Sequence, residues 1–253
     1  MKKVAMMFYR LLIPMLDPLQ LIRGLFAYPG YIRDWLSYAS MHGAEMLSIF
    51  DAQPQLHERT EVTKVDAHYF YSSGWVMRRI LANHPLRHVD IGSSVMYVNL
   101  LSAVLPVTFV DYRPLDASIE GLTNCSGDIL NLPFKDRSIN SLSCLHVAEH
   151  VGLGRYGDAL NPYGTQQACA ELMRVLSPGG YLYFALPVGK QRVCFNAHRI
   201  YSPKTIVDYF AGLELVEFSG VHDNGCFVEQ VGLDEFFKCR YACGMFIFKK
   251  KAD

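Results

Sequence analysis

The sequence lacks a net charge, a paired set of cysteines and a long uncharged apolar segment. Its 253 residues contain 24 Lys and Arg against 24 Asp and Glu, so no chain-wide basic surface is available for nucleic acid. The seven cysteines are odd in number and scattered, and Cys239 and Cys243 have no second pair to complete a zinc site. We therefore expect reduced, structural thiols, as in a cytosolic protein.

The amino-terminal segment lacks the features of a membrane span or a secretory signal. Charged residues interrupt its apolar stretches, and Pro14 and Pro18 are expected to break any continuous helix. Two interpretations remain for this extension. We favour a helical segment packed on the main domain or on another subunit. In the alternative, residues 1–30 lie on a membrane surface. The expected location is cytoplasmic, either free or peripheral to the inner face of the membrane.

The remainder of the chain alternates between strand-like and helix-like segments, without repeats, a phosphate-binding loop or a serine nucleophile elbow. We expect helices at residues 66–83, 95–104, 165–176 and 203–211, and strands at 87–91, 107–111, 122–126, 139–145, 181–188, 213–219 and 243–249. This order predicts an α/β, Rossmann-like fold: a mostly parallel seven-stranded sheet with helices on both faces. The expected units are a helical amino-terminal extension, residues 1–60, and the Rossmann-like domain, residues 61–253.

A glycine-containing loop follows the first expected strand. Gly92, in Asp90-Ile91-Gly92-Ser93-Ser94, allows a tight turn and a close approach by a ligand. Asp111 ends the next strand, where a carboxylate can accept hydrogens from both ribose hydroxyls. Asp128 can accept from the exocyclic amine of adenine. These residues predict a nucleoside site.

Two longer segments carry a family resemblance. GDILNLPFKDRSINSLSCLHVAEHV and LMRVLSPGGYLYFALP resemble blocks of the class I S-adenosylmethionine-dependent methyltransferases, and the likeness covers roughly residues 66–250. Within it, VDIGSS, EHVGLGRYGD and NAHRIYS resemble an uncharacterised methyltransferase-like family associated with bacterial surface-polysaccharide genes.

The resemblance implies S-adenosylmethionine as the cofactor and assigns six residues to its site. Asp90 and Gly92 would contact the methionine part, Asp111 the ribose and Asp128 the adenine, with Ser94 and Ile129 completing the site. One departure concerns the usual three alternating glycines, which here are Gly92, Ser94 and Met96. Met96 is expected to place a long side chain where the backbone normally passes the ligand, so a closed pocket is the alternative.

A polar cluster follows the strand at 139–145. If the chain turns helical there, His146, Glu149 and His150 share one face. We favour His146 or His150 as a general base that takes a hydroxyl proton. Alternatively, Glu149 and His150 form a structural network with each other or with Arg155. In a third interpretation, which we do not adopt, His146, Glu149, His150 and His198 bind a divalent metal.

Substrate contacts are expected from two further segments. Arg155, Tyr156 and Asp158 belong to a glycine-rich loop that could cover a substrate, and Arg199 follows the fifth strand beside His198. The favoured function is methyl transfer to an oxygen of a sugar or another small polar acceptor, and the acceptor class rests on the resemblance. The alternatives are an inactive methyltransferase-like protein that acts through partner or membrane binding, and a dinucleotide-dependent oxidoreductase. The sequence leaves the oligomeric state open.

Overall fold

The computed structural model describes residues 17–252 and divides the chain into two units, with the boundary between Lys64 and Val65. The sequence interpretation placed this boundary between residues 60 and 61. In the first unit the described elements are α2 (Pro18–Ala39) and the 3-10 turn η1 (Ile49–Asp51). Residues 1–16, which include half of the segment considered for membrane contact, lie outside the described residues.

The helix α2 begins at Pro18, one of the two prolines expected to interrupt a helix, while Pro14 lies outside the described residues. Asp17 caps the helix by accepting from the N–H groups of Leu19 and Gln20, and Pro18 occupies its first turn. Proline is tolerated there because its missing N–H would have no helical partner. The helix also continues through Pro29. Among the described residues, no helix combines the length and low polarity needed to cross a bilayer.

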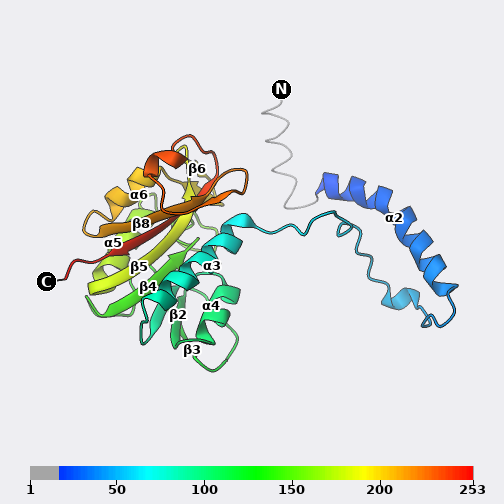
Figure 1. The fold of residues 1–253 in the computed structure, drawn as a ribbon, viewed down its shortest axis with the longest axis horizontal. Coiled ribbons are helices and arrows are strands. Elements are labelled where there is room, and N and C mark those ends of the chain that lie inside the picture. The colour runs from blue at the N-terminus through cyan, green and yellow to red at the C-terminus, as the bar shows by residue number, and fades with distance from the viewer. Residues whose placement is uncertain (1–16, 253) are drawn as a thin grey trace. The chain divides into compact units, whose positions relative to one another are not determined.

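The second unit is built on an eight-stranded sheet with the order β3-β2-β1-β4-β5-β10-β8-β9. Strands β1 to β5 are parallel, while β10 lies between β5 and β8 and runs antiparallel to both. The strands are β1 (His88–Ile91), β2 (Val107–Asp111), β3 (Leu122–Ser126), β4 (Ile139–Leu145), β5 (Leu176–Val188), β8 (Glu214–Val221), β9 (Phe227–Val228) and β10 (Ala242–Lys249). This confirms the Rossmann-like, mostly parallel sheet (Figure 1). The strand absent from the sequence prediction is β9, which has only two residues.

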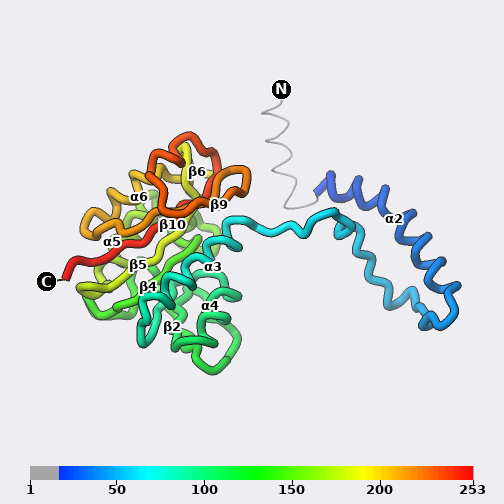
Figure 2. The backbone as a smooth tube through the Cα atoms, viewed as in Figure 1, coloured from blue at the N-terminus to red at the C-terminus, as the bar shows by residue number. Residues whose placement is uncertain are grey.

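Helices cover both faces of this sheet (Figure 2). The sheet therefore separates two hydrophobic clusters, one on each face. The helices α3 (Ala67–Ala82) and α4 (Val95–Ser102) pack on one face, and α5 (Gly164–Val175) and α6 (Pro203–Tyr209) pack on the other. Alternate residues of β5 enter the two cores: Phe184 and Leu186 join α5 and α6, whereas Tyr183 and Ala185 join α3 and α4. This alternation is expected of a strand buried on both faces. The 3-10 turn η2 (Leu233–Phe236) closes the α6 side.

Two local features differ from the sequence prediction. Strand β5 begins at Leu176, ahead of the expected start at residue 181, and runs through Pro178-Gly179-Gly180. Gly179 adopts a φ of 76°, and its N–H donates to the carbonyl of Lys250, so these residues are held against the end of β10. The second feature is a separate hairpin of β6 (Arg192–Cys194) and β7 (His198–Ile200), which the sequence did not reveal.

Candidate functional site

A cavity of about 290 Å³ lies where β1, β2 and β3 end, at the carboxyl edge of the sheet. Folds of this type bind ligands at this edge. Gly92, Asp111, Asp128 and Ile129 all line it, so four of the six expected cofactor residues come together.

Gly92 lies at a crowded position in the cavity wall. Its φ of 66° lies in the left-handed region, and a Cβ there would lie 3.2 Å from Cγ1 of Val147 and 3.6 Å from Oδ2 of Asp111. The loop therefore requires glycine for both its conformation and its space.

The two carboxylates are held by neighbouring backbone N–H groups. Oδ1 of Asp111 accepts from the N–H of Arg113 at 2.7 Å, and Oδ1 of Asp128 accepts from the N–H of Leu130 at 2.9 Å. These short-range bonds fix each side chain against the cavity wall, since such Asx turns are local and rigid. Both groups are placed to accept hydrogen bonds from a ligand.

Asp90 and Ser94 do not line this cavity, which corrects their assignment to direct contact. Asp90 is fully buried; it accepts from the N–H and hydroxyl of Ser93 and from the hydroxyl of Ser143. Burial raises the pKa of Asp90 to about 6, although these hydrogen bonds oppose the shift. Asp90 thus holds the loop that contains Gly92 and Ser93 in place without contacting the cavity. Ser94 occupies the N-cap position of α4 without a side-chain cap bond.

Met96 does not obstruct the cavity. Its side chain is 64% exposed on α4 and does not line the cavity wall. The expected conflict with a ligand is therefore wrong, because the helix directs this residue into solvent.

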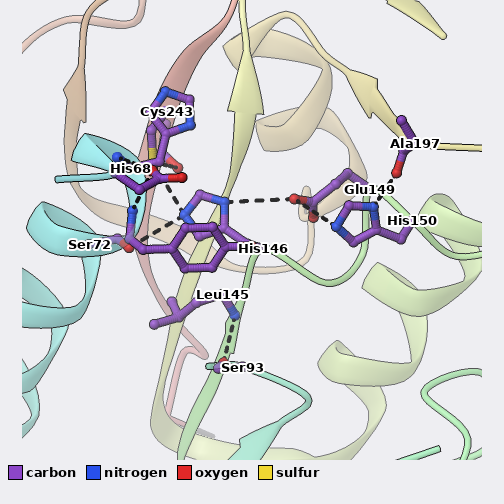
Figure 3. Close-up of polar contacts among 12 residues, drawn as sticks. His68, Ser72, Ser93, Leu145, His146, Glu149, His150, Ala197 and Cys243 are labelled. Atoms are coloured by element: carbon purple, nitrogen blue, oxygen red, sulfur yellow. Dashed lines mark hydrogen bonds and ion pairs between the residues drawn. The ribbon is translucent and has the colours of Figure 1, made fainter. Parts of the chain in front are cut away.

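The polar cluster beyond β4 lies beside the cavity, but its backbone is not helical (Figure 3). His146 has a φ of 58°, and successive turns follow it. Oε1 of Glu149 lies 3.7 Å from Nδ1 of His146 and 3.7 Å from Nε2 of His150. Turns rather than a helix face therefore bring these three side chains together.

His146 contacts two further groups through its other nitrogen. Its Nε2 lies 3.4 Å from Oγ of Ser72 and 3.7 Å from Sγ of Cys243. Burial disfavours the imidazolium, but Cys243 and Glu149 face the ring and raise the pKa of His146 above its usual value. Both ring nitrogens of His146 thus face side chains of the protein, which argues against His146 as the general base.

Glu149 is 1% exposed, and its Oε2 has no hydrogen-bond partner within residues 17–252. A buried carboxylate oxygen without a donor costs about 1–3 kcal/mol, and such atoms concentrate at functional sites. No group of three or more His, Cys, Asp or Glu in the described part of the chain has metal-binding geometry.

A second cavity, of about 420 Å³, adjoins the first, and His146 and His150 line both cavities. His68 and Tyr69 at the start of α3, His198 of β7 and Tyr241 before β10 line it as well. The ring of Tyr241 lies between those of His68 and His198, at centroid distances of 4.9 and 5.0 Å. Sequence reasoning missed Tyr241. Its position follows from the direction of β10, which runs antiparallel to β5 and therefore starts at the carboxyl edge of the sheet.

The four expected substrate residues have different environments. Tyr156 lines the first cavity, with Arg113 stacked over its ring at 4.5 Å, and Arg155 lines the second. Asp158 lines the first cavity, but its carboxylate accepts from the N–H groups of Gly152, Gly154 and Tyr156 and so organises the loop.

Arg199 corrects its assignment as a substrate residue. It is 5% exposed, and its guanidinium donates to the carbonyls of Val151 and Asn161 and to the hydroxyl of Thr165. A buried guanidinium engaged in this way holds the glycine-rich loop to α5 and is not available to a ligand.

Comparisons with known proteins show the fold. Residues 135–250 match the model of a family described as "Caenorhabditis protein of unknown function, DUF268". No curated protein matches the sequence. Among solved structures, YcgJ from Bacillus subtilis is 14% identical with a TM-score of 0.50, covering 73% of this chain and 100% of YcgJ.

Two further solved structures have the same architecture with different activities. The N-methyltransferase NodS from Bradyrhizobium japonicum, in complex with S-adenosyl-L-homocysteine, is 15% identical with a TM-score of 0.51, covering 72% of this chain and 86% of NodS. The [4+2]-cyclase SpnF is 12% identical with a TM-score of 0.51, covering 72% of this chain and 81% of SpnF. The chain therefore has the fold of these proteins, and its reaction must be argued from its own site.

Proposed function

We propose that this protein is an S-adenosylmethionine-dependent methyltransferase. The observation that carries the proposal is the arrangement of Gly92, Asp111 and Asp128 around one cavity at the carboxyl edge of the sheet. The fold of NodS, which binds S-adenosyl-L-homocysteine, supports it. The cofactor, when bound, supplies a methyl group activated by the sulfonium.

The cavity residues fit this nucleoside. Asp111 accepts from the ribose hydroxyls, Asp128 accepts from the adenine amine, and Ile129 packs on the base. Gly92 permits the close approach that the methionine part requires, because any Cβ would crowd Val147 and Asp111. The chain's contribution to catalysis is then alignment of the acceptor with the methyl carbon.

The acceptor we propose is a hydroxyl of a sugar or a related small polar molecule, as in glycan biosynthesis. The second cavity supports this choice, since its wall combines aromatic rings with polar side chains and adjoins the first cavity through His146 and His150.

Calorimetric titration with S-adenosylmethionine and S-adenosyl-L-homocysteine tests the cofactor assignment. We expect micromolar binding that falls at least tenfold in Asp111→Ala, because one charge-assisted interaction is removed. Asp116→Ala is the matched control, since Asp116 carries the same charge outside the cavity. No binding of either nucleoside by a folded sample would contradict the proposal and favour an inactive protein that acts through partners.

We also propose a peripheral membrane contact through α2. Leu25 and Phe26 are 66% and 82% exposed, and other apolar residues of the helix are at least 48% exposed: Leu19, Leu21, Ile22, Ile32 and Leu36. Such a helix can lie in the membrane interface. We expect the full chain to sediment with phosphatidylglycerol vesicles and the double variant Leu25→Asp, Phe26→Asp to stay in solution. Equal sedimentation of both would contradict the proposal.

A further inference from the structure

Five histidines line the second cavity: His68, His146, His150, His198 and His222. An imidazole can take a proton only through a nitrogen that is unprotonated and open to the reacting group. The hydrogen bonds of these five rings therefore decide which of them can act on a molecule in the cavity.

Two of the rings also line the cofactor cavity, and both nitrogens of each ring are engaged. His146 faces Glu149 through Nδ1 and Ser72 and Cys243 through Nε2. His150 faces Glu149 through Nε2, and its Nδ1 lies 2.5 Å from the carbonyl of Ala197. The guanidinium of Arg155 lies 3.3 Å from the same Nδ1, so both nitrogens of His150 face groups of the protein.

Two more rings are held by other parts of the cavity. Nε2 of His222 lies 3.3 Å from a carboxylate oxygen of Glu235, and its Nδ1 lies 3.7 Å from Sγ of Cys239. His68 bonds to the backbone of Tyr241 through one nitrogen, and its second nitrogen makes no hydrogen bond within residues 17–252. Its ring stacks over His146 with a centroid distance of 6.0 Å, so it is held on two sides.

His198 differs from the other four. Its ring contacts Tyr241 at a centroid distance of 5.0 Å and His150 at 6.5 Å, yet neither of its nitrogens makes a hydrogen bond to any residue between 17 and 252. It is partly buried on β7, where the hairpin with β6 fixes its backbone opposite Cys194. A half-buried imidazole with free nitrogens in a ligand-sized cavity is available to a ligand.

We propose that the second cavity binds a hydroxyl-bearing methyl acceptor and that His198 is the general base that takes the proton of this hydroxyl. This inference rests on the proposed methyltransferase function. The acceptor oxygen forms a bond to the methyl carbon as the carbon–sulfur bond of the sulfonium breaks, and the sulfur keeps the electron pair. The hydroxyl proton passes to a ring nitrogen of His198, and water later removes it.

The surroundings of His198 keep its ring neutral. Burial lowers the pKa of His198; His150, Arg155 and Arg192 lower it further, and Glu149 opposes them. Tyr241, the remaining titratable neighbour in ring contact, stays protonated because burial raises its pKa to about 12. A neutral histidine at pH 7 is ready to accept a proton, whereas both nitrogens of His146 already face Glu149, Ser72 and Cys243.

Modification with diethyl pyrocarbonate tests the free nitrogen directly, because this reagent acylates unprotonated, accessible imidazoles. Digestion with trypsin after the modification places the relevant histidines in different peptides. Peptide 193–199 has His198 as its only histidine, and peptide 138–155 contains His146 and His150. Peptide 80–87 contains His84, which is exposed and serves as the reference. In the protein saturated with S-adenosyl-L-homocysteine at pH 7, we expect His198 to react within tenfold of the His84 rate and peptide 138–155 at least tenfold more slowly than His198. An unreactive His198, or equal rates for the two peptides, would overturn the assignment.

Kinetics decide whether this nitrogen is used. Tritiated S-adenosylmethionine is supplied with methyl glycosides of neutral hexoses and of uronic acids. We expect His198→Gln to lose 10²–10⁴-fold in kcat/KM. The variant should also lose the increase of kcat/KM with pH that deprotonation of His198 causes below pH 7. His222→Gln, in the same cavity, should keep that increase.

The outcomes separate this inference from the cofactor assignment. A His198→Gln variant with the wild-type pH profile would overturn the base role. If the protein binds S-adenosyl-L-homocysteine but methylates none of these glycosides, the acceptor class is overturned while the cofactor site stands. If it binds neither nucleoside, the methyltransferase proposal itself fails.

Discussion

His88 lies in β1 with both ring nitrogens bonded to serine hydroxyls of β4. Its Nδ1 is 2.7 Å from Oγ of Ser141 and its Nε2 is 2.8 Å from Oγ of Ser143, and Ser143 in turn donates to Asp90. This buried chain connects the middle of the sheet to the loop that carries Gly92. Because the ring is fully buried, desolvation lowers the pKa of His88 to about 3.

The lowered pKa of His88 predicts a loss of stability in mild acid. The unfolded chain binds a proton at His88 below about pH 6.5, whereas the folded chain does so only near pH 3. The free energy of unfolding should therefore fall as the pH drops through this window, by about 2 kcal/mol between pH 7 and pH 5 from this residue. Urea unfolding at both pH values should show that His88→Gln lacks this component, whereas the surface control His84→Gln retains it. Parallel pH dependence in all three proteins would contradict the prediction.

Gly92 allows a second prediction at the residue scale. In Gly92→Ala the Cβ would meet Val147 at 3.2 Å in a left-handed backbone conformation. We expect a destabilisation of about 1–2 kcal/mol and a loss of S-adenosyl-L-homocysteine affinity of at least tenfold. Gly212→Ala is the control, because its Cβ would lie 3.6 Å from Met173 without positive φ. Unchanged affinity in Gly92→Ala would show that the ligand does not approach this loop.

At the scale of elements, the sequence predicted the strands that end at the cofactor cavity and did not predict how the segments between strands are held. The alternation of strand-like and helix-like segments was sufficient for β1, β2 and β4, although β1 and β4 also bury polar side chains. The sequence interpretation placed His146, Glu149 and His150 on one face only if the chain turned helical after β4. A positive φ at His146 starts turns instead. No local pattern indicates such a turn, since tertiary contacts with Cys243 and Ser72 fix the ring.

Contacts between distant segments also decided which polar residues face a ligand. Arg199 and Arg155 are equally polar in the sequence, yet Arg199 bonds to the carbonyls of Val151 and Asn161 while Arg155 reaches the second cavity. Similarly, His198 is distinguished from His150 only by the absence of hydrogen bonds to the described chain. Composition and spacing do not encode these differences, because they depend on the docking of the β6–β7 hairpin.

The glycine-rich loop allows a prediction at this scale. Asp158 receives three backbone N–H bonds from residues 152–156, and these bonds lower its pKa against the opposing effect of burial. Asp158→Ala should release the loop, so trypsin should cleave after Arg155 at least tenfold faster than in the wild type. Affinity for S-adenosyl-L-homocysteine should also fall several-fold, because the loop lines the first cavity. Asp116→Ala controls for the loss of one carboxylate, and wild-type cleavage in Asp158→Ala would contradict the role of these bonds.

At the scale of the whole molecule, the residues that form both cores all belong to the second unit. The two core clusters extend from Trp75 to Phe248, and both cavities are lined by residues from Asp66 onward. The boundary at Lys64 therefore separates an extension with apolar side chains exposed on α2 from a unit that contains its own core. A unit of this kind is expected to fold independently.

A fragment of residues 65–253 tests this division. Because no core residue is removed, we expect its thermal midpoint to stay within about 3 °C of the full chain, which corresponds to roughly 1 kcal/mol for a domain of this size. Its affinity for S-adenosyl-L-homocysteine should remain within twofold, while sedimentation with phosphatidylglycerol vesicles should be lost. A fragment that starts at residue 84 and lacks α3 is the control; it should fail to fold, since Trp75, Val76 and Ile80 fill the core against β10 and β8. If the 65–253 fragment unfolded or lost the nucleoside, the first unit would have to contribute to the stability or the site of the second.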